Sequence, residues 1–283
     1  MSLQSHAKPR FVRSTQRFLG TPKGILTILL AVLTLLAIPG QGAAHVTFPL
    51  VSAMATAAAV DVFVVRMSRN AWIFPSGAIL SGLILALILG PEEPWIVPIA
   101  TATLAITSKH LFRTRLANVF NPAALALVIA AVAFGSAESW WGALPDLGWA
   151  GIPVLIVTGG FIANRINKLP LVLVFLGTYF ALFSMASFVG DASQVAEIFR
   201  APDLHMVLFF AFFMLDDPPT CPIRHRDQVQ FALIVAFMAY AFFMLWGWLY
   251  FLPTALLVGN VREAWRRRAP RPQVRPAVVT RAG

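Results

Sequence analysis

The sequence predicts an all-α, polytopic membrane protein with ten transmembrane helices arranged as two inverted sets of five. Of the 283 residues, 58% are hydrophobic and only 12% are charged, whereas roughly a quarter are charged in soluble domains. Long apolar runs also recur from Gly24 to Val258, as in chains that cross a membrane repeatedly. Because five is an odd number, two halves of five spans would enter the membrane from opposite sides, so any internal repeat must be inverted.

The apolar runs define the predicted elements in chain order. The first half, residues 24–135, holds predicted spans 24–39, 46–65, 71–90, 94–112 and 120–135. The second half, residues 149–262, holds predicted spans 149–163, 169–189, 204–215, 229–245 and 250–261. Basic tails precede and follow this membrane domain (24–262), at residues 1–23 and 263–283. The first run has no small-residue cleavage site after it, which indicates a retained helix rather than a signal peptide.

The distribution of charge supports this topology. With the N-terminus in the cytoplasm, every Lys and Arg except Arg200 falls on the cytoplasmic side. The opposite face carries acidic residues, namely Glu92, Glu93, Glu138, Asp146, Asp191, Glu197 and Asp203. This agreement with the positive-inside rule predicts that both termini are cytoplasmic. The net charge of +10 is then explained by topology and by contact with anionic lipid, and it does not require nucleic acid as a partner.

Two adjacent acids follow the predicted span 204–215. Residues 204–215 would form about 18 Å of helix, too short for an apolar layer of about 30 Å. Asp216 and Asp217 come next. Either this span is a partial helix or the two acids lie below the headgroups in a protein-lined cavity, because a carboxylate at membrane depth needs a partner or a polar surrounding. The alternative is an interfacial loop that Arg224 and Arg226 neutralise.

Interrupted segments in the first half are the other candidate sites. Ser76 and Gly77 open one span after a proline, and N-V-F-N-P opens another. Asn118 and Asn121 are three residues apart, so on a helical start they would project from one face, each with amide donors and an acceptor. The alternative is that Asn118 is a helix cap and Asn121-Pro122 an ordinary helix start.

A lone acid, Asp61, lies in the middle of the second predicted span. It is a candidate ion or proton relay, or else the partner of a polar group on another helix. The sequence shows no metal-ligand set, dinucleotide fingerprint or nucleophile triad, so oxidation of NAD(P)H would require a partner protein.

Three stretches occur in an order that is typical of one family. PSGAILSGLILALILGPEEPWIVP, NVFNPAALALV and FFMLDDPPTCP resemble landmarks of the membrane flavoprotein family that contains the D subunit of the Rnf complex and the B subunit of the sodium-pumping NADH:quinone reductase. The stretch 157–182 also resembles that family's basic loop and following span. The resemblance covers most of residues 72–265. It implies a ten-span inverted repeat related in architecture to urea and ammonium channels.

The resemblance also implies cofactor sites. A non-covalent flavin, riboflavin or FMN, would lie near the cytoplasmic side against Asn118, Asn121 and Asp217, with Asp216 as an additional acid and with Ser76 and Gly77 from the S-G pair. The family's second flavin is a covalent FMN on the threonine of an S-G-A-T motif in the outer loop. This sequence has no threonine at 134–149, so no covalent FMN is expected.

The function implied is that of a non-catalytic electron-transfer subunit in the bacterial cytoplasmic membrane. It would relay electrons among ferredoxin- or flavoprotein-type redox subunits, and the transfer could be coupled to ion movement. The alternative from a different class is a channel or transporter that keeps the inverted-repeat scaffold without a redox cofactor. The missing S-G-A-T motif and Asp61 favour this alternative.

Overall fold

The computed structural model describes residues 20–70, 72–114, 117–188 and 196–268. Within these ranges the elements are helices joined by loops, in the following order: α2 (Pro22–Gln41), α3 (Ala43–Arg69), α4 (Ser76–Ile88), α5 (Ile96–Leu111), α6 (Pro122–Phe134), η1 (Trp141–Ala143), η2 (Pro145–Ala150), α7 (Gly151–Arg165), α8 (Leu169–Ala186), α10 (Asp203–Phe213), α11 (His225–Trp246) and α12 (Phe251–Arg268). Most of the two predicted basic tails, and Asp191, lie outside the described residues.

Each predicted span coincides with one helix, and the chain is an all-helical, polytopic membrane protein. Five helical segments are long and apolar enough to cross a membrane: α2, α3, the segment Trp141–Arg165, α8 and α11. The largest difference from the predicted bounds is in α12, which continues past residue 261 to Arg268. Glu263 explains this extension, because it pairs with Arg266 and Arg267 at helical spacings of three and four.

Three helices are short and apolar. The helices α4, α6 and α10 have 13, 13 and 11 residues, or about 16–20 Å of length. The expected shortness of span 204–215 is therefore confirmed. Span 71–90 is also shorter than expected, because α4 begins only at Ser76, directly after Pro75. Residues 205–213 of α10 are all buried, so this short helix lies inside the protein rather than against lipid.

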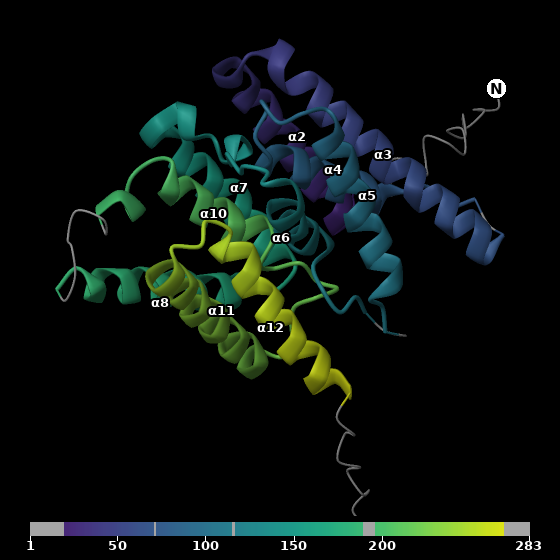
Figure 1. Ribbon diagram of the computed structural model, residues 1–283. Helices are drawn as coiled ribbons and strands as arrows, with labels where there is room; N and C mark the ends of the chain where they lie inside the picture. The colour runs from purple at the N-terminus through teal and green to yellow at the C-terminus, as the bar shows by residue number, and fades with distance from the viewer. Residues whose placement is uncertain (1–19, 71, 115–116, 189–195, 269–283) are drawn as a thin grey trace, which may run out of the picture.

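The helices of the two halves lie side by side (Figure 1). In the first half α3 packs against α4 and α5, and α5 packs against α6. In the second half α8 packs against α11, and α11 packs against α12. The helix α6 contacts α12 across the halves, and α7 contacts α10. The first residues of α6 and of α12 are buried by these contacts.

Glycines allow several of these helix pairs to approach closely. A Cβ added at Gly82 would lie 2.7 Å from the main-chain oxygen of Ala53, and one at Gly159 would lie 2.3 Å from Cγ of Phe212. Small residues at such crossings are typical of membrane helices, in which close van der Waals packing drives association. Gly159 thereby brings α7 against α10.

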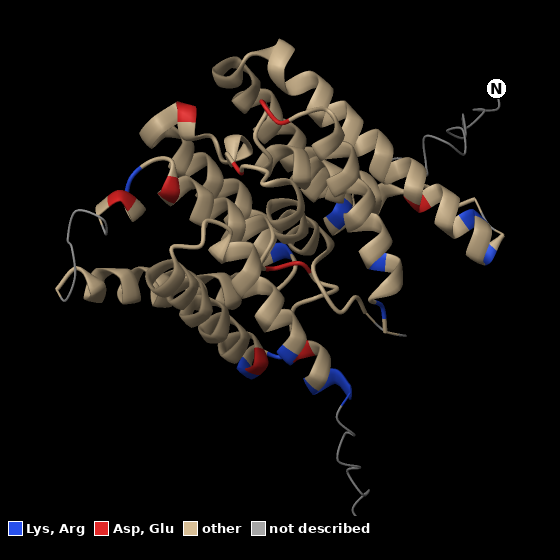
Figure 2. Cartoon of the chain, viewed as in Figure 1, with Lys and Arg blue, Asp and Glu red and all other residues tan. Residues whose placement is uncertain are grey.

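Charged residues are separated along the bundle. Figure 2 shows Lys and Arg gathered toward one end of the helices and acidic residues dominating the other. The predicted outer acids that are described lie in the loops after α4 and α6, in η2, and before or at the start of α10, and Arg200 is the basic residue among them. The acids at the basic end are exceptions to this pattern, and several of them have basic partners.

Candidate functional site

Asp216 and Asp217 lie in a buried loop directly after α10. Asp216 is 4% exposed, and its Oδ2 atom is shielded from solvent without a hydrogen-bond partner among the described residues. Asp217 is half-buried, and its Oδ2 accepts a hydrogen bond of 2.9 Å from the hydroxyl of Thr220. An interfacial loop would expose both acids to water. The structure instead shows one of them fully enclosed, with unused hydrogen-bonding capacity.

Burial also changes the acidity of this pair. Burial and the neighbouring charge of Asp217 raise the pKa of Asp216 well above its usual range. Burial raises the pKa of Asp217 to about 6, against the opposing effects of the Thr220 hydroxyl and of the cations Lys23, Lys109 and Arg267. The loop therefore sets a carboxyl whose protonated form is favoured, that of Asp216, beside one that ionises more readily, that of Asp217. Such a pair can both donate and accept hydrogen bonds.

Basic side chains hold the loop in place. Arg267 donates hydrogen bonds of 2.8 Å to the main-chain oxygens of Pro219 and Cys221, and Lys168 donates to that of Pro222. Glu263 is 1% exposed and orients Arg267 through a 2.8 Å ion pair. The extension of α12 thus has a structural role at this site, because it carries the cation that binds the loop.

Cys221 is also part of this loop. Its thiol is 3.5 Å from the main-chain oxygen of Asp216, and burial raises its pKa to about 12. A thiol with so high a pKa is not a nucleophile at neutral pH. Among the described residues no cluster of three His, Cys, Asp or Glu could hold a metal.

Asn121 connects the start of α6 to this loop. Its side-chain oxygen accepts a hydrogen bond from the main-chain N–H of Ala124, which makes it the N-cap of α6. Its Nδ2 donates to the main-chain oxygen of Met214, and its main-chain N–H donates to the side chain of Asn260. The amide is thus committed to protein partners on α10 as well as α6.

The expected arrangement of the two asparagines is wrong. Asn118 lies in the loop before α6, where it pairs with Arg113 in an isolated bridge, so the two residues do not share a helical face. Of the alternative interpretation, the helix start at Asn121-Pro122 is confirmed, whereas Asn118 as the cap is wrong, because Asn121 is the cap and Pro122 the first helical residue. The physical reason is that Pro122 needs no N–H donor at the first position, which fixes the helix start there.

A small cavity joins the two halves at this point. It has a volume of about 130 Å³, and both Asp216 and Asp217 line it. The other polar lining residues are Lys23, Ser81 and Asn121. Asn118, Ser76 and Gly77 do not line it. Gly77 is nevertheless close, because a Cβ at this position would lie 3.8 Å from the ammonium nitrogens of both Lys23 and Lys109.

Asp61 forms a second buried polar cluster beside these lysines. Its Oδ1 lies 3.2 Å from Nζ of Lys109 and 2.9 Å from Nε2 of His110. The prediction that Asp61 partners a polar group on another helix is therefore confirmed. Lys109 also acts electrostatically on Asp217, so one ammonium group influences both the mid-span acid and the acidic loop.

Sequence reasoning missed most of the residues that build this site. Lys168, Asn260 and Arg267 stand 40 to 139 residues from the groups they bind, and none belongs to a recognisable motif. The one available signal was the buried side of α12, on which Asn260 and Glu263 recur three residues apart.

Comparison with known proteins gives matches to the same family that the sequence motifs resemble. Residues 11–150 match the model of the family described as the NQR2, RnfD, RnfE family. The chain is 37% identical over 103 residues to the D subunit of an ion-translocating oxidoreductase complex from Stutzerimonas stutzeri, covering 36% of this chain and 28% of that protein. It is 31% identical over 93 residues to the protein of the same name from Aliivibrio salmonicida (strain LFI1238), covering 31% and 26%. The matched segments thus span about a quarter of these relatives. The family match includes Asn121 and Gly77 but ends before Asp216.

Proposed function

Since the chain belongs to the NQR2, RnfD, RnfE family, we propose that it is a membrane electron-transfer protein that binds a non-covalent flavin, riboflavin or FMN, at the inner cavity. The observation that carries the proposal is the buried carboxyl of Asp216, whose Oδ2 has no protein partner among the described residues and belongs to a residue that lines the cavity. An uncompensated polar atom at such a position is expensive unless a ligand satisfies it.

The polar residues that line the cavity could hydrogen-bond to one edge of a flavin ring. The flavin would supply the redox chemistry, and the protein would supply orientation and charge. A protonated Asp216 can donate a hydrogen bond to a ring carbonyl or nitrogen, and the positive charge of Lys23 favours an electron-rich ring or a phosphate. Asn121 shapes the cavity but does not hydrogen-bond to the ring, because its side-chain amide already forms hydrogen bonds with Met214 and Ala124. The cavity is smaller than typical cofactor pockets, so a whole flavin requires it to widen.

The outer loop supports a non-covalent mode only. The two hydroxyls available at 134–149 are those of Ser136 and Ser139. Ser136 lies within hydrogen-bond distance of the Tyr250 hydroxyl, and Ser139 lies 3.5 Å from the main-chain oxygen of Leu89. Neither serine stands in an S-G-A-T context, so we propose no phosphoester-linked flavin there.

The proposed topology is ten crossing elements in two inverted halves in the bacterial cytoplasmic membrane, with both termini in the cytoplasm. The packing of α3 on α5 has a counterpart in that of α8 on α11, and the packing of α5 on α6 has a counterpart in that of α11 on α12. The third helix of each half, α4 and α10, is short and is followed by an acidic, proline-containing loop. Paired short helices at equivalent positions are typical of inverted-repeat membrane folds.

A single flavin site can exchange electrons only with groups close to it, so partner proteins are needed to bring electrons and to take them away. We propose that ferredoxin- or flavoprotein-type subunits deliver and accept electrons, and that this chain is a non-catalytic subunit of an oxidoreductase complex. Asp61, with Lys109 and His110, is the proposed ion or proton relay. The same buried triad favours the second candidate function, a channel or transporter without a redox group.

The decisive experiment is purification of the chain in detergent, followed by absorbance and mass spectrometry for bound flavin. The Asp216→Ala and Asp217→Ala variants should lose flavin, whereas Glu197→Ala, which removes an exposed outer acid, should retain it. A folded wild-type protein without flavin would refute the proposal. Ion or solute flux in liposomes that disappears in Asp61→Asn would instead favour the transporter.

A further inference from the structure

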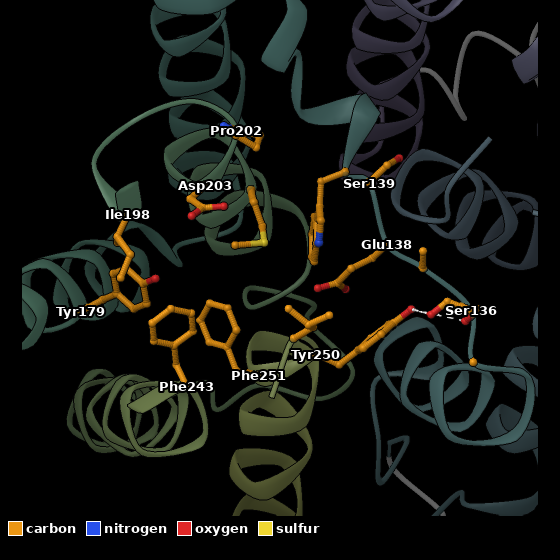
Figure 3. A pocket seen from close by; sticks show the side chains of 15 residues that line it. Ser136, Glu138, Ser139, Tyr179, Ile198, Pro202, Asp203, Phe243, Tyr250 and Phe251 are labelled. Atoms are coloured by element: carbon orange, nitrogen blue, oxygen red, sulfur yellow. Dashed lines mark hydrogen bonds between the residues drawn. The ribbon is translucent and has the colours of Figure 1, made fainter. Parts of the chain in front are cut away.

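A second and larger cavity lies at the opposite end of the bundle from the acidic loop. It has a volume of about 390 Å³, within the usual range for small-molecule pockets. The loop after α6 forms one wall, and α8, α10, α11 and the start of α12 form the others. Figure 3 shows the side chains of Glu138, Asp203, Tyr179 and Tyr250 arranged around its interior.

Three buried polar atoms around this cavity lack a hydrogen bond of normal geometry among the described residues, although two of them, on Glu138 and Trp140, act on each other. They are Oε2 of Glu138, the indole nitrogen of Trp140 and the hydroxyl of Tyr179. Trp140 is 3% exposed and Tyr179 is 0% exposed, so both side chains are shielded from bulk water. Buried polar groups are normally satisfied, and three unsatisfied ones around a single cavity indicate a missing ligand.

The charged and aromatic residues that line the cavity indicate which class of ligand it can bind. Its charged lining side chains are Glu138 and Asp203, and no Lys or Arg belongs to the described lining. Aromatic rings provide much of the remaining wall, including Trp140, Phe243 and Phe251. Carboxylates with aromatic faces attract ammonium groups, whereas a phosphate would meet only negative charge here.

We propose that this outer cavity binds an organic ammonium ion that carries an apolar or aromatic group. The ammonium donates a hydrogen bond to Oε2 of Glu138, and its apolar part lies among the aromatic rings. The N–H of Trp140 favours the ionised form of the same carboxyl, while the Tyr179 hydroxyl is available as a further acceptor. The three unsatisfied atoms then belong to one site. This site is independent of flavin binding at the inner cavity.

The protonation state of Glu138 gives the proposal a pH signature. Burial raises the pKa of Glu138 to about 8, against the opposing effect of Trp140. The titratable groups around it are Asp203 on α10, Tyr179 on α8, Tyr250 before α12, and Glu93, which bonds the adjacent Ala137 N–H. Since a cation binds the ionised form, binding below pH 8 must release one proton. When the pH is raised from 6 to 7, the apparent Kd of the ammonium should therefore fall about tenfold.

Calorimetric titration of the full chain in detergent tests the site with three probes that share a ring. The probes are 2-phenylethylammonium, neutral 2-phenylethanol and anionic phenylacetate. We expect only the ammonium to bind, and we expect Glu138→Gln to weaken it at least about tenfold. The matched control is Glu92→Gln, which removes an exposed outer acid beside His45 and should change Kd less than about twofold.

A second variant keeps the test informative if Glu138→Gln unfolds. Trp140→Phe preserves an aromatic ring and removes only the N–H, so it should weaken ammonium binding several-fold while the protein remains folded. Equal binding of phenylethanol or phenylacetate would overturn the proposal. So would a Kd for the ammonium that is independent of pH, or one that is unchanged in both Glu138→Gln and Trp140→Phe.

Discussion

The side-chain Nδ2 of Asn121 donates a hydrogen bond to the main-chain oxygen of Met214, 3.2 Å away. Met214 caps the end of α10, and Asn121 caps the start of α6, so this contact fixes the acidic loop against the other half of the chain. The main-chain N–H of Asn121 adds a 2.8 Å bond to Asn260 on α12. The helices α6, α10 and α12 therefore meet at one residue, Asn121.

Replacing Asn121 should damage both stability and the cavity. Asn121→Ala removes the cap of α6 and leaves the Met214 oxygen without its donor, and we expect a loss of about 1–3 kcal/mol in unfolding free energy. Flavin occupancy should fall in parallel, because the loop that carries Asp216 is no longer tied to α6. Thermal unfolding in detergent and flavin content measure the two effects. Asn118→Ala, in the preceding loop, is the control and should change both very little.

Arg267 should matter far more than its neighbour Arg268. Arg267→Gln removes hydrogen bonds to two main-chain oxygens of the acidic loop, and we expect a loss of about 1–3 kcal/mol. The loss is limited because Glu263 keeps its second partner, Arg266. Arg268→Gln changes an exposed residue at the helix end and should stay within about 0.5 kcal/mol. Equal midpoints of thermal unfolding for the two variants would contradict the assigned role of Arg267.

Most helices could be predicted from the sequence, and most site contacts could not. Hydrophobicity located each helix, because burial in lipid or in the protein requires apolar side chains over the whole segment. The shortness of α10 was also predictable, because the apolar run at residues 204–215 is itself short. The partners of the acidic loop were not, because Lys168, Asn260 and Arg267 reach it only after the chain has folded. Asp61 is an intermediate case. Its need for a partner was evident, but Lys109 and His110 could be identified only in three dimensions.

The pKa of Asp217 predicts a pH dependence of stability. Burial raises this pKa to about 6 from 3.8, so the folded state holds a proton that the unfolded state releases. The contribution of this group is fully present below pH 3.8 and is lost as pH rises toward 6. Asp217→Asn should therefore flatten the decline in unfolding midpoint between pH 4 and 6. Thr220→Val should extend the decline to higher pH, because the Thr220 hydroxyl favours the ionised carboxylate, while Thr220→Ser should resemble the wild type. An unchanged slope in Asp217→Asn would show that another group titrates in this range.

Two adjacent glycines on α7 provide a test of the packing that positions α10. At Gly159 an added Cβ would lie 2.3 Å from Cγ of Phe212, whereas at Gly160 it would meet nothing within 4 Å. Gly159→Ala must therefore push α10 away from α7, at a cost of about 1–3 kcal/mol. Gly160→Ala should be neutral or stabilising by up to about 1 kcal/mol, because alanine favours the helix.

The displacement in Gly159→Ala should also reach the inner cavity. Phe212 lines that cavity together with Asp216, so movement of α10 carries the acidic loop with it. We expect lower flavin content in Gly159→Ala than in Gly160→Ala when both are purified at a temperature at which both are folded. If the two variants differ in unfolding midpoint but retain equal flavin, the position of α10 does not control the cofactor site, and flavin binds elsewhere in the chain.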